Sequence, residues 1–461
     1  MSITVFRRRL PVRVAVVAVA VTLAVGALAA CSSSSSSSSS GSGGGGGKFG
    51  FTEAAQSASA SISVWVDSSR VAAADAFKKA NPTIPIQVVT YDGSANGSNS
   101  FKTKIGLLDR AGSGWPDVVF STQNNDAAWA SQQTNGKQAF AAVLNKGLVP
   151  DSTLSGFTKG ALDPCTVNGQ VYCLRNDLAQ NVLWFDKPLM DQFGYTVPTT
   201  WEDYQTLSAK VASEHPGYIT GSVGDTWTPE VFMWASKCGA NQVTGPRAVT
   251  VDATSANCQR AAKLIDSGVS NKTLTALSVF SPDFAKRYAG KVLMMPGPAW
   301  FAGAVFNNKT ALNMPAGQLG VAAPPSWGSD TAVTGDGGGG TWVISSHSKN
   351  LAAAEKFAEW VTTSDDYQVN LAPGYPAFAS AGAKWISNQE ASKYYATSLD
   401  PITQAGSEIW SGWGSAEFSQ EAIWAKTMTP IVNAGQAVAD NLSKWQTAIK
   451  DQAQVTGYTV K

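Results

Sequence analysis

The chain has 461 residues, of which 44% are hydrophobic and 15% are charged. A chain of this length buries enough apolar surface for two domains or more. Its 34 Lys and Arg side chains nearly balance its 33 Asp and Glu side chains, so the formal net charge is only +1. This balance lacks the basic excess that is typical of nucleic-acid-binding proteins.

The N-terminal segment has the pattern of a secretory signal. Four arginines between positions 7 and 13 precede an apolar run at 14–30. An uncleaved membrane anchor is the alternative, since about 17 apolar residues is the lower limit for a transmembrane helix. Leu-Ala-Ala-Cys at 28–31 resembles the bacterial lipobox, in which the chain is cut before a cysteine that then carries lipid. The sequence therefore predicts a lipoprotein signal peptide at 1–30 and lipidation of Cys31, by Sec or twin-arginine export.

A serine and glycine tract follows at 32–47. These residues have little apolar surface to bury, so the tract should stay a flexible coil with a reach of roughly 20–25 Å. We assign 31–60 to the lipidated cysteine and its tether. Removal of the leader takes away four arginines and leaves a slightly acidic chain in which no later run is long enough to span a bilayer. The expected location is the extracellular face of the bacterial cell membrane.

Strands and helices alternate in the first part of the folded chain. Alternation of apolar residues and β-branched composition predict strands at 61–66, 86–90 and 116–121, with helices at 71–80, 101–111 and 126–132. This order is typical of an α/β fold with a parallel sheet covered by helices. Such sheets bind ligands at the carboxyl ends of their strands, which here carry the polar segments 65–69 and 121–126.

Four cysteines remain after the lipobox, and an even number in an exported chain favours disulfides. Cys165 and Cys173 flank Asn-Gly at 168–169, which is the strongest short signal for a hairpin turn. The turn brings these two cysteines together, and elimination then pairs Cys238 with Cys258. A zinc site is the alternative, but the chain has no CxxC spacing and only two histidines.

The middle of the chain carries a series of spaced motifs. Tyr-Cys-Leu at 172–174 and Asn-Val-Leu-Trp-Phe-Asp-Lys at 181–187 precede Gly194, Pro198 and Thr-Trp-Glu at 200–202. This order resembles the extracellular sugar-binding proteins of bacterial ABC importers, the maltose-binding-like family, with its "Y-x-L-P … N-V-L-Y-Y-N-K" and "P-x-T-W-E-E" segments. The chain departs from that pattern after Leu174, where Arg175 replaces the usual proline.

Three later segments continue the resemblance in the same order. They are "GKVLMMPGPAWFAG" at 290–303, "LGVAAPPSWG" at 319–328 and "GDGGGGTWVISSHSKNLAAAEKFAEWVTTSDDYQ" at 335–368. The matching positions are spread from about residue 62 to about residue 449. The family resemblance therefore covers nearly the whole folded chain.

The resemblance implies two α/β lobes, each built from discontinuous segments, that close on a sugar like jaws. One lobe would comprise 62–178 and 322–363, and the other 179–321 and 364–461. The hinge would lie where the chain crosses between them, near 177–180, 322 and 362–365. The implied partners are a carbohydrate, expected to be an oligosaccharide, and ABC permease subunits in the membrane. We expect a monomer without a cofactor or metal and without enzymatic activity.

The glycine run at 335–340 fits G-x-G-x-x-G literally. A dinucleotide fingerprint must open a helix, whereas the residues at 341–345 predict a strand. We therefore interpret the run as a place where backbone approaches a ligand, with amides free to donate. The two histidines, His215 and His347, lie outside any catalytic motif and are expected at the surface. A surface-anchored glycoside hydrolase, and an amino-sugar or polyol receptor of the same build, stay open as alternatives.

The chain has 16 tryptophans, and many of them lie at strand ends or in loops rich in Gly, Ser and Pro. Indole planes stack on the C–H faces of sugars, while sugar hydroxyls need polar partners. In the family segment that 290–303 resembles, the tryptophan stacks on a sugar ring, which implies this role for Trp300. The predicted ligand-binding residues are Trp65, Asp67, Ser68, Gln123, Asn124, Asp126, Asp177, Gln180, Trp227, Trp300, Gly338, Gly339, Trp413 and Trp424.

Overall fold

A computed structural model describes residues 47–92, 97–133, 137–245 and 247–461. The predicted signal peptide, Cys31 and the serine tract lie outside the described residues. The segment 47–60, which the sequence analysis assigned to the tether, packs against the folded chain instead. Phe51 is buried in a hydrophobic core, and Gln56 bonds to the backbone at Ser348 and Leu351. The aromatic and amide side chains that follow the glycine tract explain this difference, because they have partners to pack against.

The first sheet has five strands in the order β2-β1-β3-β15-β6. Their bounds are β1 Ile62–Val66, β2 Ile86–Thr90, β3 Val118–Ser121, β6 Leu174–Arg175 and β15 Thr341–Ile344. Strand β1 pairs in parallel with β2 and β3, as predicted from the alternating elements. Strand β15 arrives from more than two hundred residues later and pairs antiparallel with β3 and β6. The sheet is therefore mixed, and it is assembled from separate parts of the sequence.

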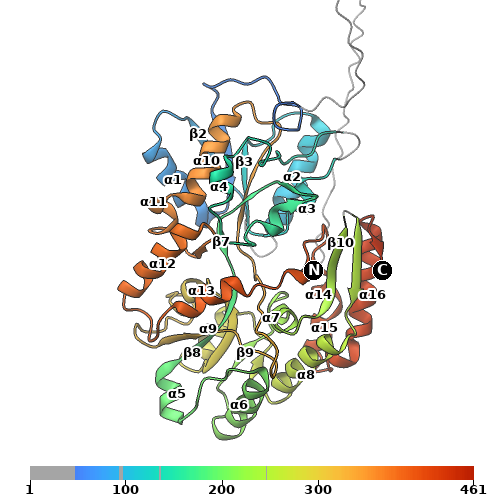
Figure 1. Cartoon of the computed structure of the whole chain (residues 1–461). Helices are drawn as coiled ribbons and strands as arrows, with labels where there is room; N and C mark the ends of the chain where they lie inside the picture. The colour runs from blue at the N-terminus through green and yellow to red at the C-terminus, as the bar shows by residue number, and fades with distance from the viewer. Residues whose placement is uncertain (1–46, 93–96, 134–136, 246) are drawn as a thin grey trace, which may run out of the picture. The chain divides into compact units, whose positions relative to one another are not determined.

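Helices cover this sheet (Figure 1). Their bounds are α1 Val71–Ala80, α2 Gly97–Ala111, α3 Ala127–Ala130, α4 Asp151–Leu154, α10 Leu351–Thr363 and α11 Asp365–Gln368. Helix α12, Ala379–Ala391, packs next to α11. Helix α1 begins and ends at the predicted residues, because its apolar side chains recur at helical spacing. Its Phe77 meets Phe357 of α10 edge-to-face, with ring centroids 4.9 Å apart. This contact joins two helices that are far apart in the sequence.

A second sheet is centred on β8. Its strands are β8 Asn181–Asp186, β13 Met294–Pro298 and β14 Leu319–Ala322, and β8 pairs antiparallel with both neighbours. All six residues of β8 are buried, as its nearly continuous apolar run suggests. The Asp186 carboxylate then accepts a hydrogen bond from the Leu189 amide at 3.0 Å and caps α5, Lys187–Phe193. Gly194 ends this helix in the left-handed conformation.

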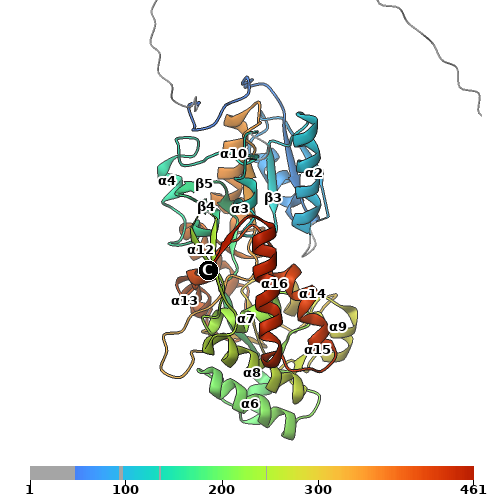
Figure 2. The same cartoon turned by 90° about the vertical axis from the view of Figure 1, so that its right-hand side faces the viewer.

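A third sheet has the order β10-β11-β17, with bounds β10 Gly239–Gly245, β11 Ala248–Asp252 and β17 Thr459–Val460. Helix α16, Leu442–Val455, packs against all three strands. The neighbouring helices are α6 Trp201–Glu214, α7 Thr228–Ala235, α8 Ala256–Ser270 and α14 Gln420–Thr427. Helices α14 and α16 pack side by side (Figure 2), and Trp424 meets Trp445 edge-to-face at 5.0 Å. This aromatic pair forms part of a second hydrophobic core.

Shorter elements complete the described chain. The strands are β4 Thr166–Val167, β5 Gln170–Val171, β7 Asp177–Leu178, β9 Gly221–Ser222, β12 Leu274–Thr275 and β16 Tyr375–Pro376. The helices are η1 Ser68–Arg70, η2 Asp163–Cys165, α9 Pro282–Tyr288, η3 Ala302–Phe306, α13 Asp400–Ser407, η4 Ser411–Trp413, α15 Thr429–Asn433 and η5 Ala439–Asn441. Across the described ranges, no helix combines the length and the apolar character needed to cross a bilayer.

The cysteine pairing predicted from the hairpin and by elimination is confirmed. Cys165 is bonded to Cys173, and Cys238 is bonded to Cys258. The turn between the first pair joins β4 to β5, with Asn168 and Gly169 both at positive φ, 53° and 76°. Asn and Gly tolerate this left-handed backbone, so the Asn-Gly signal was a reliable guide to the disulfide.

Loss of the second disulfide should destabilise the fold more than loss of the first. It closes a loop with a sequence separation of 20 residues, against 8 for the first, and longer loops give the unfolded chain more entropy. We expect the Cys238→Ala/Cys258→Ala variant to lose about 3 kcal/mol of unfolding free energy, and Cys165→Ala/Cys173→Ala about 2.5 kcal/mol. Urea unfolding of both variants measures the difference. An equal or reversed order would contradict the loop argument.

Candidate functional site

A cavity of about 1440 Å³ is lined by residues from the segments that follow β1 and β3, the glycine run at 335–340, and helices α7 and α14. Its size exceeds the usual range for a drug-sized ligand. Nine of the predicted ligand-binding residues line this cavity. They are Asp67, Gln123, Asn124, Asp177, Trp227, Trp300, Gly338, Gly339 and Trp413. The structure therefore brings together polar strand ends, loop tryptophans and glycines that are distant in the sequence.

Four predicted residues near the first sheet and the crossing at 177–180 do not line the cavity. Trp65 packs against the first hydrophobic core, and Ser68 is exposed in η1. The Asp126 carboxylate is buried and pairs with Lys102 and the Ser121 hydroxyl. Gln180 is fully buried, and its side-chain amide donates to the Ile402 carbonyl at 2.7 Å. Strand-end position alone did not tell which side chains face the cavity.

Trp424 does not lie on the cavity lining either. It was predicted to face a ligand because it follows a stretch of Gly and Ser residues. Instead it lies within α14, is 1% exposed, and packs in the second hydrophobic core against Trp445. Burial of its large apolar surface explains the position, and the residue no longer counts among the candidates.

The Asp67 carboxylate lies at the carboxyl end of β1, on the cavity wall. It accepts hydrogen bonds from the Arg70 amide at 2.9 Å and from the Arg70 guanidinium at 3.2 Å. Burial raises the pKa of this carboxyl above its usual value, against the opposing effect of Arg70. The Arg70 guanidinium also stacks over the Phe120 ring at 4.5 Å. Asp67 is thus held in a fixed orientation beside the cavity.

The glycine run at 335–340 lines the cavity, but its amides are not free in the way we predicted. Gly337 donates to the Ala179 carbonyl at 2.8 Å, and Gly340 donates to the Asp177 carboxylate at 3.0 Å. Gly339 has φ +77°, and a Cβ there would lie 2.7 Å from the Asp177 carbonyl oxygen. These glycines are therefore needed for close packing against the protein's own backbone, and a strand follows them as predicted.

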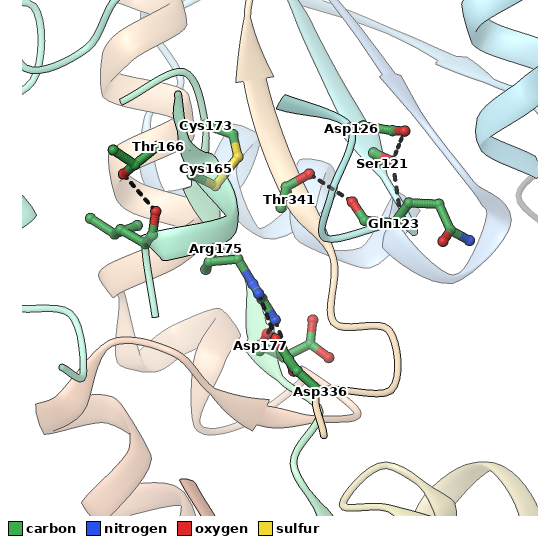
Figure 3. The surroundings of a disulfide bond; sticks show 11 residues. Ser121, Gln123, Asp126, Cys165, Thr166, Cys173, Arg175, Asp177, Asp336 and Thr341 are labelled. Carbon is green, nitrogen blue, oxygen red and sulfur yellow. Dashed lines mark hydrogen bonds and ion pairs between the residues drawn. A yellow bond between two sulfur atoms is a disulfide. The ribbon is translucent and has the colours of Figure 1, made fainter. Parts of the chain in front are cut away.

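Arg175 holds this run through its guanidinium, which points toward Asp336 (Figure 3). Its guanidinium is fully buried and bonds the Asp336 carboxylate at 2.8 and 3.3 Å and the Asp177 carbonyl at 2.9 Å. The Asp336 carboxylate also accepts from the Ala179 amide at 2.9 Å and from the Asn124 side chain at 3.2 Å. One buried ion pair thus connects β6, the glycine run and the polar segment after β3. Arg175 stands where the family pattern usually has a proline, after Leu174.

An aromatic group forms one wall of the cavity. The Trp300 ring lies 5.5 Å from Trp227, 5.0 Å from Phe301 and 6.0 Å from Phe280, which is nearly parallel to it. The Trp300 indole N–H donates to the Gly337 carbonyl at 2.9 Å. Trp300 is only partly buried, whereas its neighbour Phe301 is 1% exposed. The hydrogen bond and the flanking rings fix the indole plane while part of it stays accessible.

Residues 65–368 match the family model described as bacterial extracellular solute-binding protein. The chain belongs to this family. No relative was found among the curated protein sequences compared. The matched range runs from the end of β1 to the end of α11 and includes all three strands of the sheet centred on β8.

Solved structures resemble this solute-binding protein over most of its length. The binding protein of an ABC transporter from B. animalis subsp. lactis, in complex with beta-1,6-galactobiose, has 21% identity and a TM-score of 0.70, covering 87% of this chain and 99% of its own. The galacto-N-biose-/lacto-N-biose I-binding protein from Bifidobacterium longum, in complex with lacto-N-biose, has 18% identity and a TM-score of 0.68, covering 88% and 100%.

A third structure, the cyclic alpha-maltosyl-1,6-maltose binding protein from Arthrobacter globiformis, has 15% identity and a TM-score of 0.67, covering 86% of this chain and 99% of its own. At such identities the likeness establishes the fold. The predicted two-lobe α/β fold and the predicted family are confirmed. The segment boundaries of the two lobes and the position of the hinge stay predictions.

Several residues on the cavity wall of this solute-binding protein were not predicted. They are Arg70, Glu230, Asn241, Phe280, Asp336 and Gln420. Glu230 could have been found, because it is the one acid in the apolar helix segment "TPEVFMWA" and must either be buried or interrupt the apolar face. Asn241 and Gln420 had no comparable signal, since they become neighbours of the cavity only through tertiary packing. No cluster of metal-ligating side chains occurs among the described residues.

Proposed function

We propose that this solute-binding protein captures a carbohydrate outside the cell and delivers it to an ABC transporter permease while a lipid on Cys31 holds it at the membrane. The observation that carries the proposal is the cavity, whose lining includes partly exposed indoles together with carboxylates and side-chain amides. Indoles stack on the apolar faces of sugar rings, and the polar groups bond the hydroxyls. Related folds whose structures contain saccharides support the same reading.

The ligand-binding residues that we propose are Asp67, Gln123, Asn124, Asp177, Trp227, Trp300 and Trp413, because they line one cavity. The glycines at 338 and 339 would shape its wall. The cavity volume of about 1440 Å³ favours an oligosaccharide over a single ring. The protein would act as a monomeric receptor without a cofactor and without cleaving its ligand.

A saccharide panel tests this function. We expect at least one di- or trisaccharide to raise the melting temperature, because a ligand at about 100 times its Kd adds about 2.7 kcal/mol of stability. Calorimetry then gives the affinity and stoichiometry, and chromatography of the recovered sugar shows whether it stays intact. Release of shorter saccharides would instead favour the glycoside hydrolase alternative. Absence of binding across the panel would contradict carbohydrate capture.

The ligand should also shift the equilibrium between open and closed forms by its differential affinity for the closed form. Small-angle scattering with saturating ligand should therefore show a smaller radius of gyration than without it. An unchanged radius would count against closure of the two proposed lobes.

One contact beside the cavity gives a sharper prediction. The Arg247 guanidinium, just before β11, donates to the side chain of Gln132, just after α3, at 2.5 Å, and it also pairs with Glu417. The contact joins segments that pack on different sheets. We expect Arg247→Ala to weaken saccharide binding by about 1 kcal/mol, chiefly through faster release, because the group is partly exposed and screened.

The matched control is Arg260→Ala, because the Arg260–Asp330 pair at 3.0 Å is similarly exposed and lies away from the cavity lining. Surface plasmon resonance of both variants measures the two rate constants. Equal effects of the two substitutions would show that the Arg247 contact has no particular role in retaining ligand.

A further inference from the structure

The wall of the cavity that is formed by α7, β10 and α14 holds three buried polar side chains with unsatisfied hydrogen-bonding atoms. Glu230 in α7 is 2% exposed, and Asn241 in β10 and Gln420 in α14 are each 3% exposed. All three line the cavity. Glu230 Oε1, Asn241 Oδ1 and both Oε1 and Nε2 of Gln420 have no hydrogen-bond partner within the protein. Native proteins seldom leave such atoms unpaired, because desolvating them is costly.

The unpaired atoms are mainly acceptors. Asn241 Nδ2 donates to the Gly414 carbonyl at 3.2 Å, which fixes the amide so that Oδ1 is the free atom. Each possible orientation of the Gln420 amide leaves one oxygen and one NH₂ group. The wall therefore offers oxygen acceptors from Glu230, Asn241 and Gln420 against a single donor group. A ligand that satisfies it must be rich in donors.

The two acids on this wall, Glu230 and Glu421, form no ion pair with a basic side chain among the described residues. The charged group that acts on Glu230 among the described residues is the acid Glu421, whose carboxylate accepts only from the Ser419 hydroxyl. Elsewhere on the cavity lining, Asp67 is paired with Arg70, and Asp336 is paired with Arg175. Burial, with a smaller effect of Glu421, holds the pKa of Glu230 well above its usual value. A positively charged group bound beside Glu230 would therefore favour the ionised form of this carboxyl.

We propose that Glu230, Asn241, Gln420 and Glu421 form a subsite for a protonated amine, and that the preferred ligand is a saccharide carrying a free amino group. An ammonium group has three donors and no acceptor, so it matches the three oxygen acceptors on this wall. Its charge compensates the two neighbouring acids through charge-assisted hydrogen bonds. The Gln420 amide NH₂ is left to bond a ring hydroxyl. This inference rests on the proposed carbohydrate-binding function and names the class of sugar.

Matched disaccharides test the subsite on the full chain. The probes are the β-1,4-linked glucosamine disaccharide, its N-acetylated form and cellobiose, which share ring and linkage and differ only at the 2-position. Galactosamine, N-acetylgalactosamine and galactose form a second set that is independent of linkage. We expect the free amine to bind about 10- to 100-fold more tightly than either neutral counterpart, as charged hydrogen bonds do relative to neutral ones. Calorimetry at neutral pH measures the ratio.

The decisive variant is Glu230→Gln, which keeps the shape of the side chain and removes its charge. It should lose the preference for the amine, by about 10- to 100-fold, while affinity for neutral sugars stays within about twofold. Asp163→Asn is the matched control, because Asp163 also lines the cavity but is exposed, and it should leave the preference unchanged. Thermal melting checks folding. If Glu230→Gln does not fold, Glu421→Gln should show a smaller loss in the same direction.

The possible outcomes distinguish failure of the amine subsite from failure of the proposed carbohydrate-binding function. Binding of neutral sugars with no gain from the amine would overturn the subsite and leave carbohydrate capture standing. The same preference in wild type and Glu230→Gln would show that other groups recognise the amine. Failure of every saccharide, charged or neutral, would overturn both the subsite and the proposed function.

Discussion

Replacing Arg175 with methionine is expected to lower the free energy of unfolding by about 3–5 kcal/mol. The guanidinium is fully buried, and its partner Asp336 is only 12% exposed at the side chain. Methionine fills similar space but leaves the carboxylate without its positive partner in a poorly solvated position. The penalty comes mainly from this stranded charge, so it should exceed the loss of a surface ion pair several-fold.

The loss of Arg175 should also reach the ligand site. Asp336 and Gly337 belong to the run that Arg175 holds, and the Gly337 carbonyl in turn accepts from the Trp300 indole. Displacement of this run would therefore reorient an aromatic wall of the cavity. We expect the variant that still folds to bind saccharide more weakly than wild type, even though Arg175 itself does not line the cavity.

Urea unfolding measures the free energy of unfolding of Arg175→Met. Two further variants show where its loss comes from. Arg260→Met removes a partly exposed ion pair and should cost no more than about 1 kcal/mol. Arg175→Met/Asp336→Asn should recover part of the loss, because the uncompensated charge is gone. A loss below about 1 kcal/mol for Arg175→Met would mean that water or another group satisfies Asp336.

Local patterns predicted the elements of the fold well. Alternating and helical spacing placed β1, α1 and β2. The Asn-Gly turn located a disulfide because its backbone requirement is local. The antiparallel arrival of β15 beside β3 could not be predicted in this way, because strand pairing across more than two hundred residues depends on tertiary packing.

The candidate site was predicted only in part, for a similar reason. Asp67 and Gln123 were found because parallel strands end at one edge of the sheet. Whether a loop tryptophan faces a cavity depends on what packs against it, and this separates Trp413 on the cavity wall from Trp424 in the core. The unpaired side chains of the proposed amine subsite come from helices and a strand that meet only in the folded protein. Glu230 alone left a trace in the sequence, as an acid among apolar residues.

Trp300→Ala is expected to weaken saccharide binding by about 1–3 kcal/mol, by analogy with stacking of nucleic-acid bases on aromatic side chains. The indole is positioned before the ligand arrives, since its N–H is bonded to the Gly337 carbonyl and Trp227 and Phe301 pack against its ring. Such preorganisation reduces the entropy lost on binding. Because Trp300 is only partly buried, its removal should cost less stability than the roughly 3–5 kcal/mol of a fully buried tryptophan.

Trp300→Phe separates the two contributions of this side chain. Phenylalanine keeps an aromatic face for stacking but cannot donate to Gly337. If stacking dominates, Trp300→Phe should retain most of the affinity that Trp300→Ala loses. If both variants lose affinity equally, the indole acts by anchoring the glycine run, and the aromatic face has little direct contact with ligand. Calorimetry with a shared saccharide, together with a urea melt of each variant, decides between these results. Unchanged affinity in Trp300→Ala would remove the residue from the site altogether.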